Sequence, residues 1–262
     1  MVEIKSAGRV LNLAEVYFAE TPDCTVKSKC DVVLYHNRRI LSDVRNEHSI
    51  GYTLVSDLSA SEDEIFGRIR KNVRYDIRRS ERDGIVFNVF ESKDILLADF
   101  SEKMDKFAEC HDSMYQSKGL NFKFNRNEII KFAEQNASII TVASFEGNPI
   151  VWHFYIADDT HVKFTISCSL FRESDSKELV DIIGRANKAL HWHDMKYLKG
   201  IGIISYDWGG CDWHDETLAD GIDNFKLSFG GEKVSYYTER VLMTLKSKIY
   251  TKVMALCRKK ST

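Results

Sequence analysis

Two short stretches in the second half of the chain decide the fold. Residues 206–210 read Tyr-Asp-Trp-Gly-Gly, and residues 221–231 read Gly-Ile-Asp-Asn-Phe-Lys-Leu-Ser-Phe-Gly-Gly. The first stretch follows an apolar run, 201–205, which predicts a strand that ends near Asp207. The second stretch predicts a short helix that presents Lys226 before another glycine pair. A strand end followed by such a helix builds a crevice, so a binding or catalytic site is expected here.

The composition restricts the class of protein. The chain has 262 residues, and its 37 lysines and arginines nearly balance its 39 aspartates and glutamates. Because the net charge is close to zero, the molecule as a whole does not attract nucleic acid electrostatically. A phosphate-binding site would have to be a local patch of basic residues. No apolar run reaches the ~18 residues that span a bilayer, and the amino terminus lacks a signal-peptide pattern. The six cysteines form no Cys-x-x-Cys pair. We therefore expect a cytoplasmic protein without a zinc site.

Predicted strands and helices alternate along the rest of the chain. Ser61 and Glu64 form a capping-box pattern, which predicts a helix that begins there and runs to Arg82. Asn125 and Glu128 mark a second helix start. The remaining predicted elements are strands at 31–35, 50–55, 85–90, 138–145, 150–157, 162–167, 201–205 and 232–238, helices at 93–116 and 176–199, the short helix that bears Lys226, and a basic helix near the carboxy terminus.

The two opening stretches resemble the carboxy-terminal part of the Fem-type aminoacyltransferases and related acyltransferases of the GNAT (Gcn5-related N-acetyltransferase) fold. Those proteins carry a Tyr-Asp-(Trp/Phe)-Gly-Gly strand end and a Gly-Ile-x-x-Phe-Lys-x-x-Phe-Gly-Gly helix. Residues 71–84 and 184–192 are similar to further blocks of the same proteins, so the resemblance covers roughly the last three quarters of the chain. The predicted order of elements after Gly84 is also that of a GNAT domain.

The resemblance implies an α/β (α+β) fold, with a GNAT-like mixed sheet flanked by helices. Residues 1–84 are expected to form a shortened, GNAT-like amino-terminal lobe that ends in a basic helix. Residues 85–262 are expected to form a GNAT-fold acyltransferase domain with a basic carboxy-terminal helix. The fuller first lobe and the coiled-coil arm of many Fem-type proteins do not fit into the residues before Gly84.

The helix before Gly84 is strongly basic. Seven lysines or arginines occur between residues 68 and 82, and only Asp76 and Glu81 oppose them. Because arginine matches phosphate geometry, a nucleotide-sugar diphosphate, a lipid pyrophosphate or RNA are candidate ligands. A solvated face, or salt bridges between the lobes, is the alternative. The candidate phosphate-binding residues are Lys71, Arg74, Arg78 and Arg79.

The resemblance implies transfer of an acyl or aminoacyl group onto an amine, which requires a proton acceptor and oxyanion stabilisation. Asp207 is the candidate proton acceptor, and a structural turn cap is the alternative. Lys226 lies one step off the apolar stripe of Ile222, Phe225 and Phe229, which places it at the edge of the buried face. There a cation would neutralise a donor phosphate or stabilise the oxyanion.

Aromatic residues complete the candidate site. By the resemblance, Phe225 is a stacking surface for the end of a transfer RNA. Tyr206 and Trp208 are candidate substrate-binding residues, and Trp213 and His214 are further candidates for an acceptor site; packing is the alternative for such side chains. His191 and His193 lie two residues apart on one predicted helix, which is poor metal geometry and favours core or surface roles.

The donor is left open by the turn at residues 171–176. Coenzyme A users of this fold carry a (Gln/Arg)-x-x-Gly-x-(Gly/Ala) loop there, whereas this chain reads Phe-Arg-Glu-Ser-Asp-Ser. Without glycines, backbone amides approach a pyrophosphate less freely. Acyl-coenzyme A, an acyl-carrier protein and aminoacyl-tRNA therefore all stay candidate acyl donors, and no metal is expected.

The predicted carboxy-terminal helix combines cations with an apolar stripe. No acid follows Glu239, and Leu245, Ile249, Val253 and Leu256 recur at helical spacing. Packing of this stripe on the domain and peripheral contact with an anionic membrane are the two interpretations.

Together these features predict a Fem-like N-acyltransferase that modifies an amino group on a cell-envelope precursor. The expected acceptor is an amino sugar of surface polysaccharide (O-antigen or capsule) biosynthesis, carried on a nucleotide or a lipid. One alternative is a peptidoglycan-bridge aminoacyltransferase that uses aminoacyl-tRNA. The other is a non-catalytic module that binds a glycan or a nucleotide.

Overall fold

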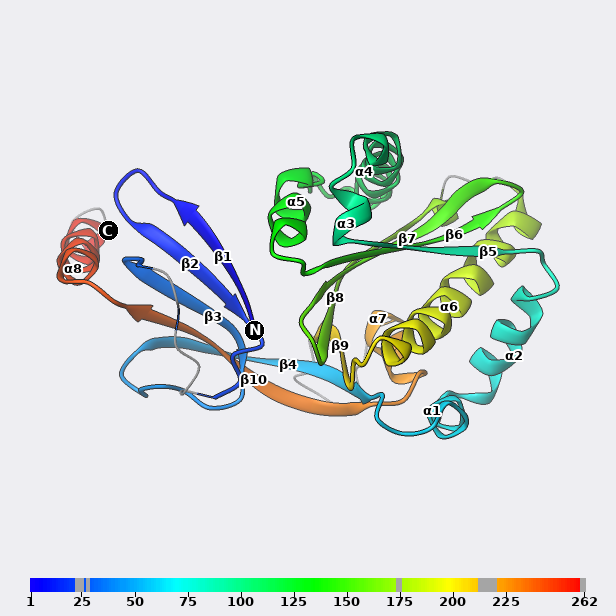
Figure 1. Cartoon of the computed structure of the whole chain (residues 1–262), viewed down its shortest axis with the longest axis horizontal. Coiled ribbons are helices and arrows are strands. Elements are labelled where there is room, and N and C mark those ends of the chain that lie inside the picture. The colour runs from blue at the N-terminus through cyan, green and yellow to red at the C-terminus, as the bar shows by residue number, and fades with distance from the viewer. Residues whose placement is uncertain (22–25, 27–28, 173–175, 212–220, 260–262) are drawn as a thin grey trace. The chain divides into compact units, whose positions relative to one another are not determined.

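The computed structural model describes residues 1–21, 26, 29–172, 176–211 and 221–259 (Figure 1). Their contacts divide the chain into two compact units. Unit 1 consists of Met1–Tyr52 and Val234–Thr262, and unit 2 consists of Thr53–Lys233. The contact division thus falls at positions other than Gly84, and a GNAT-like origin of residues 1–84 stays a prediction.

Unit 1 is a small sheet followed by a helix. Its strands lie in the order β1 (Val2–Ala7), β2 (Asn12–Tyr17), β3 (Val32–Arg38) and β10 (Glu232–Leu242), and helix α8 (Leu245–Lys259) follows β10. The β2–β3 pair is parallel, and the other two pairs are antiparallel. Strands β1 and β2 were not predicted from the sequence, because charged residues such as Glu3 and Lys5 interrupt their short apolar pattern.

A fully buried carboxylate links separate segments of unit 1 by hydrogen bonds. Glu239 of β10 accepts a 2.6 Å hydrogen bond from Arg38 Nη1 and a 2.8 Å hydrogen bond from Asn46 Nδ2. The backbone N–H of Ser42 also donates to this carboxylate. Burial raises the pKa of Glu239, but the hydrogen bonds from Asn46, Ser42 and Arg38 outweigh it and bring the pKa down to about 2.

Unit 2 holds the rest of the sheet. From the end of β4 (Glu47–Asp57) the strand order is β9 (Ser205–Cys211), β8 (His161–Ser169), β7 (Asn148–Ala157), β6 (Ser138–Phe145) and β5 (Val86–Glu91). Strands β5 to β8 pair antiparallel, whereas β8 and β9 are parallel. The parallel pairing ends at Lys163 and Asp207, so the last residues of β8 lie beyond it.

Helices cover both faces of the unit 2 strands (Figure 1). Helices α4 and α5, with the short α3, lie on one face, and α6 lies on the other face with α2 packed beside it. Their bounds are α1 (Glu62–Arg68), α2 (Lys71–Ser80), α3 (Ser92–Ile95), the 3-10 turn η1 (Ala98–Phe100), α4 (Ser101–Ser117), α5 (Arg126–Glu134), the 3-10 turn η2 (Leu170–Arg172), α6 (Lys177–Gly200) and α7 (Gly221–Leu227).

This order of strand, helices, three antiparallel strands, helix, strand, helix and strand confirms the predicted α/β fold, a GNAT-like mixed sheet flanked by helices. Both predicted caps are present. The Ser61 side chain accepts from the Glu64 N–H, and the Glu64 carboxylate accepts from the Ser61 N–H. Asn125 caps α5 in the same way through the Glu128 N–H. None of the described helices is both long and apolar enough to cross a membrane.

The single helix predicted from Ser61 to Arg82 is wrong, because the backbone breaks between α1 and α2. Ile69 is extended, and the Arg70 N–H donates to the carbonyl oxygen of Ser228 at 2.8 Å instead of continuing the helix. Gly230 packs against the break: a Cβ on it would lie 2.9 Å from the Arg68 Cβ, and its φ is 78°. Only glycine fits both conditions.

Two other predicted boundaries are also wrong. The helix expected at 93–116 is split into α3, η1 and α4. The strand expected at 201–205 begins at Ser205, because residues 201 and 202 form the turn after α6 and Gly202 has a φ of 98°. Asp207 therefore lies inside β9 rather than at the end of a strand.

Candidate active site

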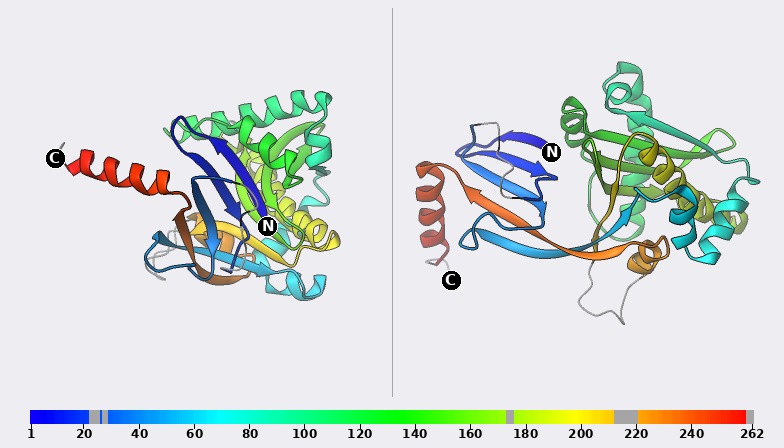
Figure 2. Two further views of the ribbon diagram at one scale, coloured as in Figure 1. Left: turned by 60° about the vertical axis from the view of Figure 1, so that its left-hand side comes forward. Right: turned by 60° about the horizontal axis from the view of Figure 1, so that its bottom comes forward.

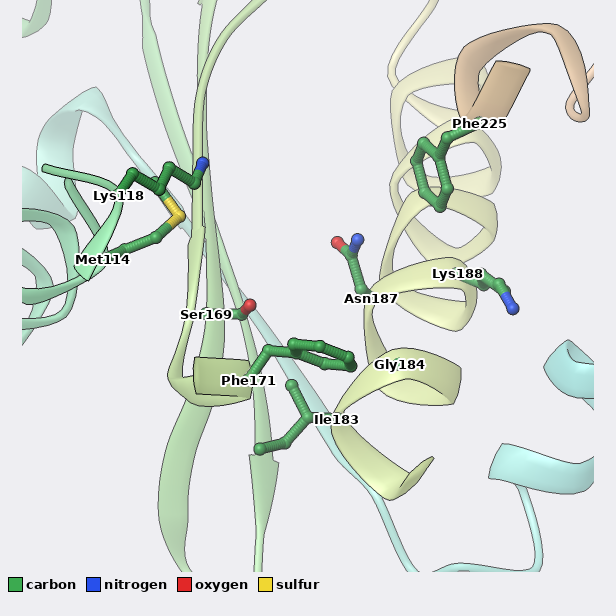
Figure 3. A pocket seen from close by; sticks show the side chains of 9 residues that line it. All are labelled: Met114, Lys118, Ser169, Phe171, Ile183, Gly184, Asn187, Lys188 and Phe225. Carbon is green, nitrogen blue, oxygen red and sulfur yellow. The ribbon is translucent and has the colours of Figure 1, made fainter. Parts of the chain in front are cut away.

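A cavity of about 400 Å³ opens in unit 2 beside the end of β8 (Figure 3). Helix α6 forms one wall, α4 forms the opposite wall, and Phe225 of α7 closes one end. The lining residues are Met114, Lys118, Ser169, Phe171, Ile183, Gly184, Asn187, Lys188 and Phe225.

The lining is mainly apolar with a few polar groups. Met114, Phe171, Ile183 and Phe225 supply the apolar surface, while Lys118 is an exposed cation at the α4 side. A small-molecule site of this size typically has such a lining. Sequence analysis named Phe225 but not the α4 and β8 residues, because the chain brings them together only through the fold.

Asp207 organises the first glycine pair. Its Oδ1 atom accepts hydrogen bonds from the Thr53 hydroxyl and from the Gly209 N–H, the latter at 2.8 Å. The Thr53 hydroxyl also contacts the Gly209 carbonyl oxygen at 2.7 Å. Gly209 has a φ of 75°, and a Cβ on it would lie 2.9 Å from the Phe164 carbonyl oxygen. Strand β9 therefore requires glycine at this position.

Lys226 connects the two opening stretches of sequence. Its side chain is buried, and Nζ donates to the Gly210 carbonyl oxygen at 2.6 Å and to the Gly209 carbonyl oxygen at 3.5 Å. The cation therefore lies against the glycine pair rather than in solvent. Ile222 is 61% exposed, so the apolar stripe expected to include it is limited to Phe225 and Phe229.

Tyr206 and Trp208 lie in the core and do not line the cavity. The Trp208 indole N–H donates to Ser56 Oγ at 2.9 Å, and the Tyr206 hydroxyl lies 3.0 Å from that of Tyr155. Phe225 is half-buried, and its ring centroid lies 5.4 Å from that of His191. Trp213, His214 and the central residues of the 171–176 turn lie outside the described residues.

The basic segment is attached to α6 by its acids. Asp76 accepts a 2.6 Å hydrogen bond from Lys188 Nζ, and Asp83 accepts one of the same length from Arg185 Nε. The cations of α2 are left on its outer face, and none of the four candidate phosphate-binding residues lines the cavity. Within the described part of the chain, Lys71, Arg74, Arg78 and Arg79 form no salt bridge.

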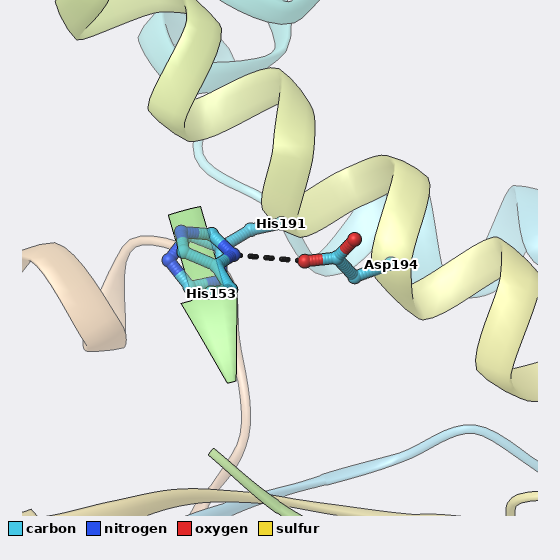
Figure 4. A group of neighbouring side chains, drawn as sticks. All are labelled: His153, His191 and Asp194. Carbon is cyan, nitrogen blue, oxygen red and sulfur yellow. Dashed lines mark hydrogen bonds and ion pairs between the residues drawn. The ribbon is translucent and has the colours of Figure 1, made fainter. Parts of the chain in front are cut away.

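A buried polar network behind the cavity was not predicted (Figure 4). His153 of β7 contacts Asp194 Oδ2 through Nδ1 at 2.8 Å and Asn187 Oδ1 through Nε2 at 3.0 Å. Asp194 Oδ2 also accepts hydrogen bonds from the hydroxyls of Tyr155 and Thr141. The partners come from different elements far apart in sequence, so no local pattern could have shown them.

The network continues to Tyr206 and His191. His191 Nδ1 lies 3.1 Å from the Tyr206 hydroxyl. Burial, with the charges of His153 and Lys226, lowers the pKa of His191 well below its usual value, so this ring is neutral. Burial and the Asp194 charge raise the pKa of Tyr155 and Tyr206. Burial raises the pKa of Asp194, but its hydrogen-bond donors, first among them His153, outweigh this and leave it lowered.

His153, His191 and Asp194 also have the donor types of a metal site, and their ligand atoms all lie within 4.8 Å of one another. Four of the donor atoms are engaged in hydrogen bonds, however, and Asp194 Oδ1 is the buried oxygen that has no such partner among the described residues. Both ring nitrogens of His153 and Oδ2 of Asp194 have partners, and His191 Nδ1 has the Tyr206 hydroxyl. A ligand set needs free lone pairs facing one ion, so we assign the cluster to the network.

Comparisons with known proteins show the fold. No protein-family model matches the sequence, and no curated protein matches it. The C-terminal domain of a protein assigned as a lysylphosphatidylglycerol synthetase from Agrobacterium fabrum is similar, with a TM-score of 0.55 and 14% identity over 83% of this chain and 70% of that one.

Two further solved structures are similar at the same level. L-PGS from Bacillus licheniformis has a TM-score of 0.53 and 15% identity, and the match covers 84% of this chain and 71% of that one. FemX has a TM-score of 0.54 and 13% identity over 76% of this chain and 63% of its own. At these identities the likeness shows the fold that this chain shares with them.

Proposed function

We propose that this chain is an acyltransferase, which moves an acyl or aminoacyl group onto an amine in the cavity of unit 2. The observation that carries the proposal is the hydrogen bond between Lys226 Nζ and the Gly210 carbonyl oxygen. It joins the two sequence stretches that resemble Fem-type enzymes, and the neighbouring Phe225 lines the cavity. The names of the similar structures support transfer chemistry of this kind.

Two residues carry the chemistry in this proposal. Lys226 supplies positive charge, either to a donor phosphate or to the negative charge that develops on the acyl group. Its ammonium group has three N–H donors, and the two glycine carbonyls described above accept two of them. Asp207 accepts the proton of the attacking amine, directly or through a water.

The proposed acceptor is an amino sugar on a nucleotide- or lipid-linked precursor of the cell envelope. A sugar with its first phosphate fits a cavity of about 400 Å³. The apolar rings of Phe171 and Phe225 would pack on the sugar face, and Lys118 is the cation available to a phosphate. Acyl-coenzyme A and an acyl-carrier protein are the donors to test with this acceptor.

The outer face of α2 favours a second candidate, in which aminoacyl-tRNA is the donor and a peptidoglycan precursor is the acceptor. Lys71, Arg78 and Arg79 are exposed, and in the described residues no carboxylate pairs with them. Exposed cations without acidic partners suit a phosphate backbone. Arg78 lies over the Phe66 ring at 5.2 Å, so part of this face is already ordered.

Helix α8 supports a peripheral contact with an anionic membrane. Leu245 is 73% exposed and Ile249 is 53% exposed, so packing on the domain does not account for the apolar stripe. Lys248 and Lys252 are exposed on the same helix. Figure 2 draws this helix in red at the carboxy-terminal end of the ribbon. An exposed apolar stripe flanked by lysines matches a surface of anionic lipid.

The test is a donor and acceptor screen by mass spectrometry. Purified protein is mixed with UDP- and dTDP-linked amino sugars and, in turn, acyl-coenzyme A, acyl-carrier protein or charged tRNA. A mass gain on an amino sugar establishes the first candidate, whereas transfer only from charged tRNA to a muropeptide precursor establishes the second. If these ligands bind without any mass gain, the protein is a non-catalytic module that binds a glycan or a nucleotide.

A further inference from the structure

The ring of His153 lies between two hydrogen-bond acceptors. Nδ1 is 2.8 Å from a carboxylate oxygen of Asp194, and Nε2 is 3.0 Å from the side-chain oxygen of Asn187. A carboxylate and an amide oxygen can only accept. As the structure orients the Asn187 amide, both ring nitrogens of His153 face acceptors, and the proposal below requires both of them to donate.

Several donors surround the carboxylate of Asp194. Its Oδ2 atom accepts three hydrogen bonds, from His153, from the Tyr155 hydroxyl at 2.6 Å and from the Thr141 hydroxyl at 3.0 Å. His153 and Asp194 have fully buried side chains. The three donors therefore converge on Oδ2, whereas Oδ1 of Asp194 is buried without a hydrogen-bond partner among the described residues.

Asn187 is fixed in one orientation as a result. Its Oδ1 atom is held by the His153 N–H, so its Nδ2 atom is turned away from the ring. Asn187 lines the cavity, and Figure 3 shows its amide directed into it from α6. Among the described residues no acceptor takes the two Nδ2 hydrogens. The Asn187 amide is therefore an oriented neutral donor that α6 presents to the cavity.

We propose that Asn187 Nδ2 binds the carbonyl oxygen of the transferred acyl group, and that Asp194 and His153 position it. This rests on the function proposed above. As the amine nitrogen forms the new C–N bond, the carbonyl electron pair moves onto the oxygen that Nδ2–H holds. Collapse restores the carbonyl and breaks the C–O or C–S bond to the donor. The proton that the amine gives to Asp207 then passes to the leaving group.

A fixed donor of this kind is useful because it needs no rearrangement during the reaction. Side-chain amides stabilise oxyanions in acyl transfer, and loss of one such donor costs ~10²–10³ in kcat. A hydrogen bond from the His153 ring to Oδ1 also polarises the Asn187 amide, which strengthens the Nδ2–H donors. Asn187 is thus the residue that touches substrate, and the two buried residues act through it.

The first test needs no substrate. In protein labelled with ¹⁵N-histidine at pH 7, both ring nitrogens of His153 should give the chemical shifts of protonated nitrogens. An unprotonated Nε2 would mean that the amide is turned, with Oδ1 toward the cavity, and would overturn the proposal. The second test adds S-acetyl-N-acetylcysteamine, a small thioester, and follows the side-chain NH₂ signal of Asn187, which should shift. A signal that does not move at saturation also overturns the proposal.

The third test uses Asn187→Asp, which keeps the size of the side chain and an acceptor for His153 but removes both N–H donors. With the donor and acceptor found in the screen, kcat should fall ~10²-fold with little change in KM. Asn127→Asp, an exposed position on α5, is the matched control and should keep wild-type kcat. Unchanged kcat in Asn187→Asp refutes the role.

Failure of the proposed function is distinguishable from failure of this inference. If the wild-type protein transfers no acyl group but the Asn187 signal still shifts with the thioester, the cavity binds carbonyl groups and the chain is not an acyltransferase. If transfer occurs and Asn187→Asp is fully active, the function holds and Asn187 has no part in it.

Discussion

Lys226 Nζ lies 2.6 Å from the carbonyl oxygen of Gly210. The cation of the 221–231 stretch is therefore hydrogen-bonded to the backbone of the 206–210 stretch. We expect Lys226→Met, which keeps the length of the side chain, to lower turnover ~10²-fold because the charge near the reacting group is lost. Lys131→Met on the exposed side of α5 is the control. Wild-type turnover in a folded Lys226→Met protein would assign the lysine to structure alone.

Asp207→Asn separates a proton acceptor from a turn cap. Asparagine keeps an oxygen for the Thr53 hydroxyl and the Gly209 N–H, so β9 should stay intact. Turnover should nevertheless fall ~10²-fold, because an amide does not take up the amine proton. Steady-state kinetics beside a melting curve measures both quantities. A variant that loses thermal stability but not turnover would identify Asp207 as a cap.

Arg78→Ala combined with Arg79→Ala tests the outer face of α2. Neither arginine is in a salt bridge within the described residues, so the folded state should lose little stability. Binding of the phosphate-bearing substrate should weaken, and its dependence on salt should flatten, because fewer counterions are released. Titrations at several salt concentrations measure this. Lys103→Ala with Lys131→Ala removes two exposed charges elsewhere and should leave the slope unchanged.

Acid should destabilise unit 1 through Glu239. The pKa of this carboxyl is about 2 in the folded chain against an ordinary value of 4.5. A depressed pKa contributes stability that is present above pH 4.5 and is lost as the pH falls toward 2. The contribution is on the order of 3 kcal/mol. Denaturant unfolding from pH 6 to pH 2 should show it, and Glu239→Gln should remove most of that pH dependence at the cost of lower stability at pH 6.

Contact of α8 with lipid can be measured by vesicle flotation. The wild-type protein should float with vesicles that contain phosphatidylserine and stay behind with phosphatidylcholine alone. Ile249→Asp with Val253→Asp should abolish flotation, because both side chains are at least half exposed on the apolar stripe. Ile40→Asp with Val44→Asp is the control, because it changes two apolar residues outside α8 that are more exposed than the α8 pair. If both double variants lose flotation equally, lipid contact through α8 is contradicted.

Local signals in the sequence predicted much of the fold. The capping residues Ser61 and Asn125 mark helix starts that the structure confirms. The sequence did not reveal the break after α1, because Ile65, Ile69 and Val73 keep a helical apolar spacing across it. No proline interrupts them, and a single glycine such as Gly67 is tolerated inside a helix. The cause of the break lies more than 150 residues away, at Ser228 and Gly230.

The candidate site also combines residues that the sequence predicts with residues that it does not. Phe225 and Lys226 stand in a contiguous motif, and the structure brings that motif to the cavity and to the first glycine pair. Asn187, His153 and Asp194 have no common motif, since β7 and α6 meet only through packing of a helix on a sheet. A sequence pattern records neighbours along the chain, and hydrogen-bond partners across layers leave no such record.

The division of the chain between its two units has a consequence for synthesis on the ribosome. Thr53–Lys233 is one continuous segment, whereas the other unit needs both Met1–Tyr52 and the residues after Val234. All of the segment that holds the cavity is therefore translated before strand β10, with its buried Glu239, is complete. The nascent chain can fold this segment first, whereas Arg38 can bind Glu239 only after β10 has been translated.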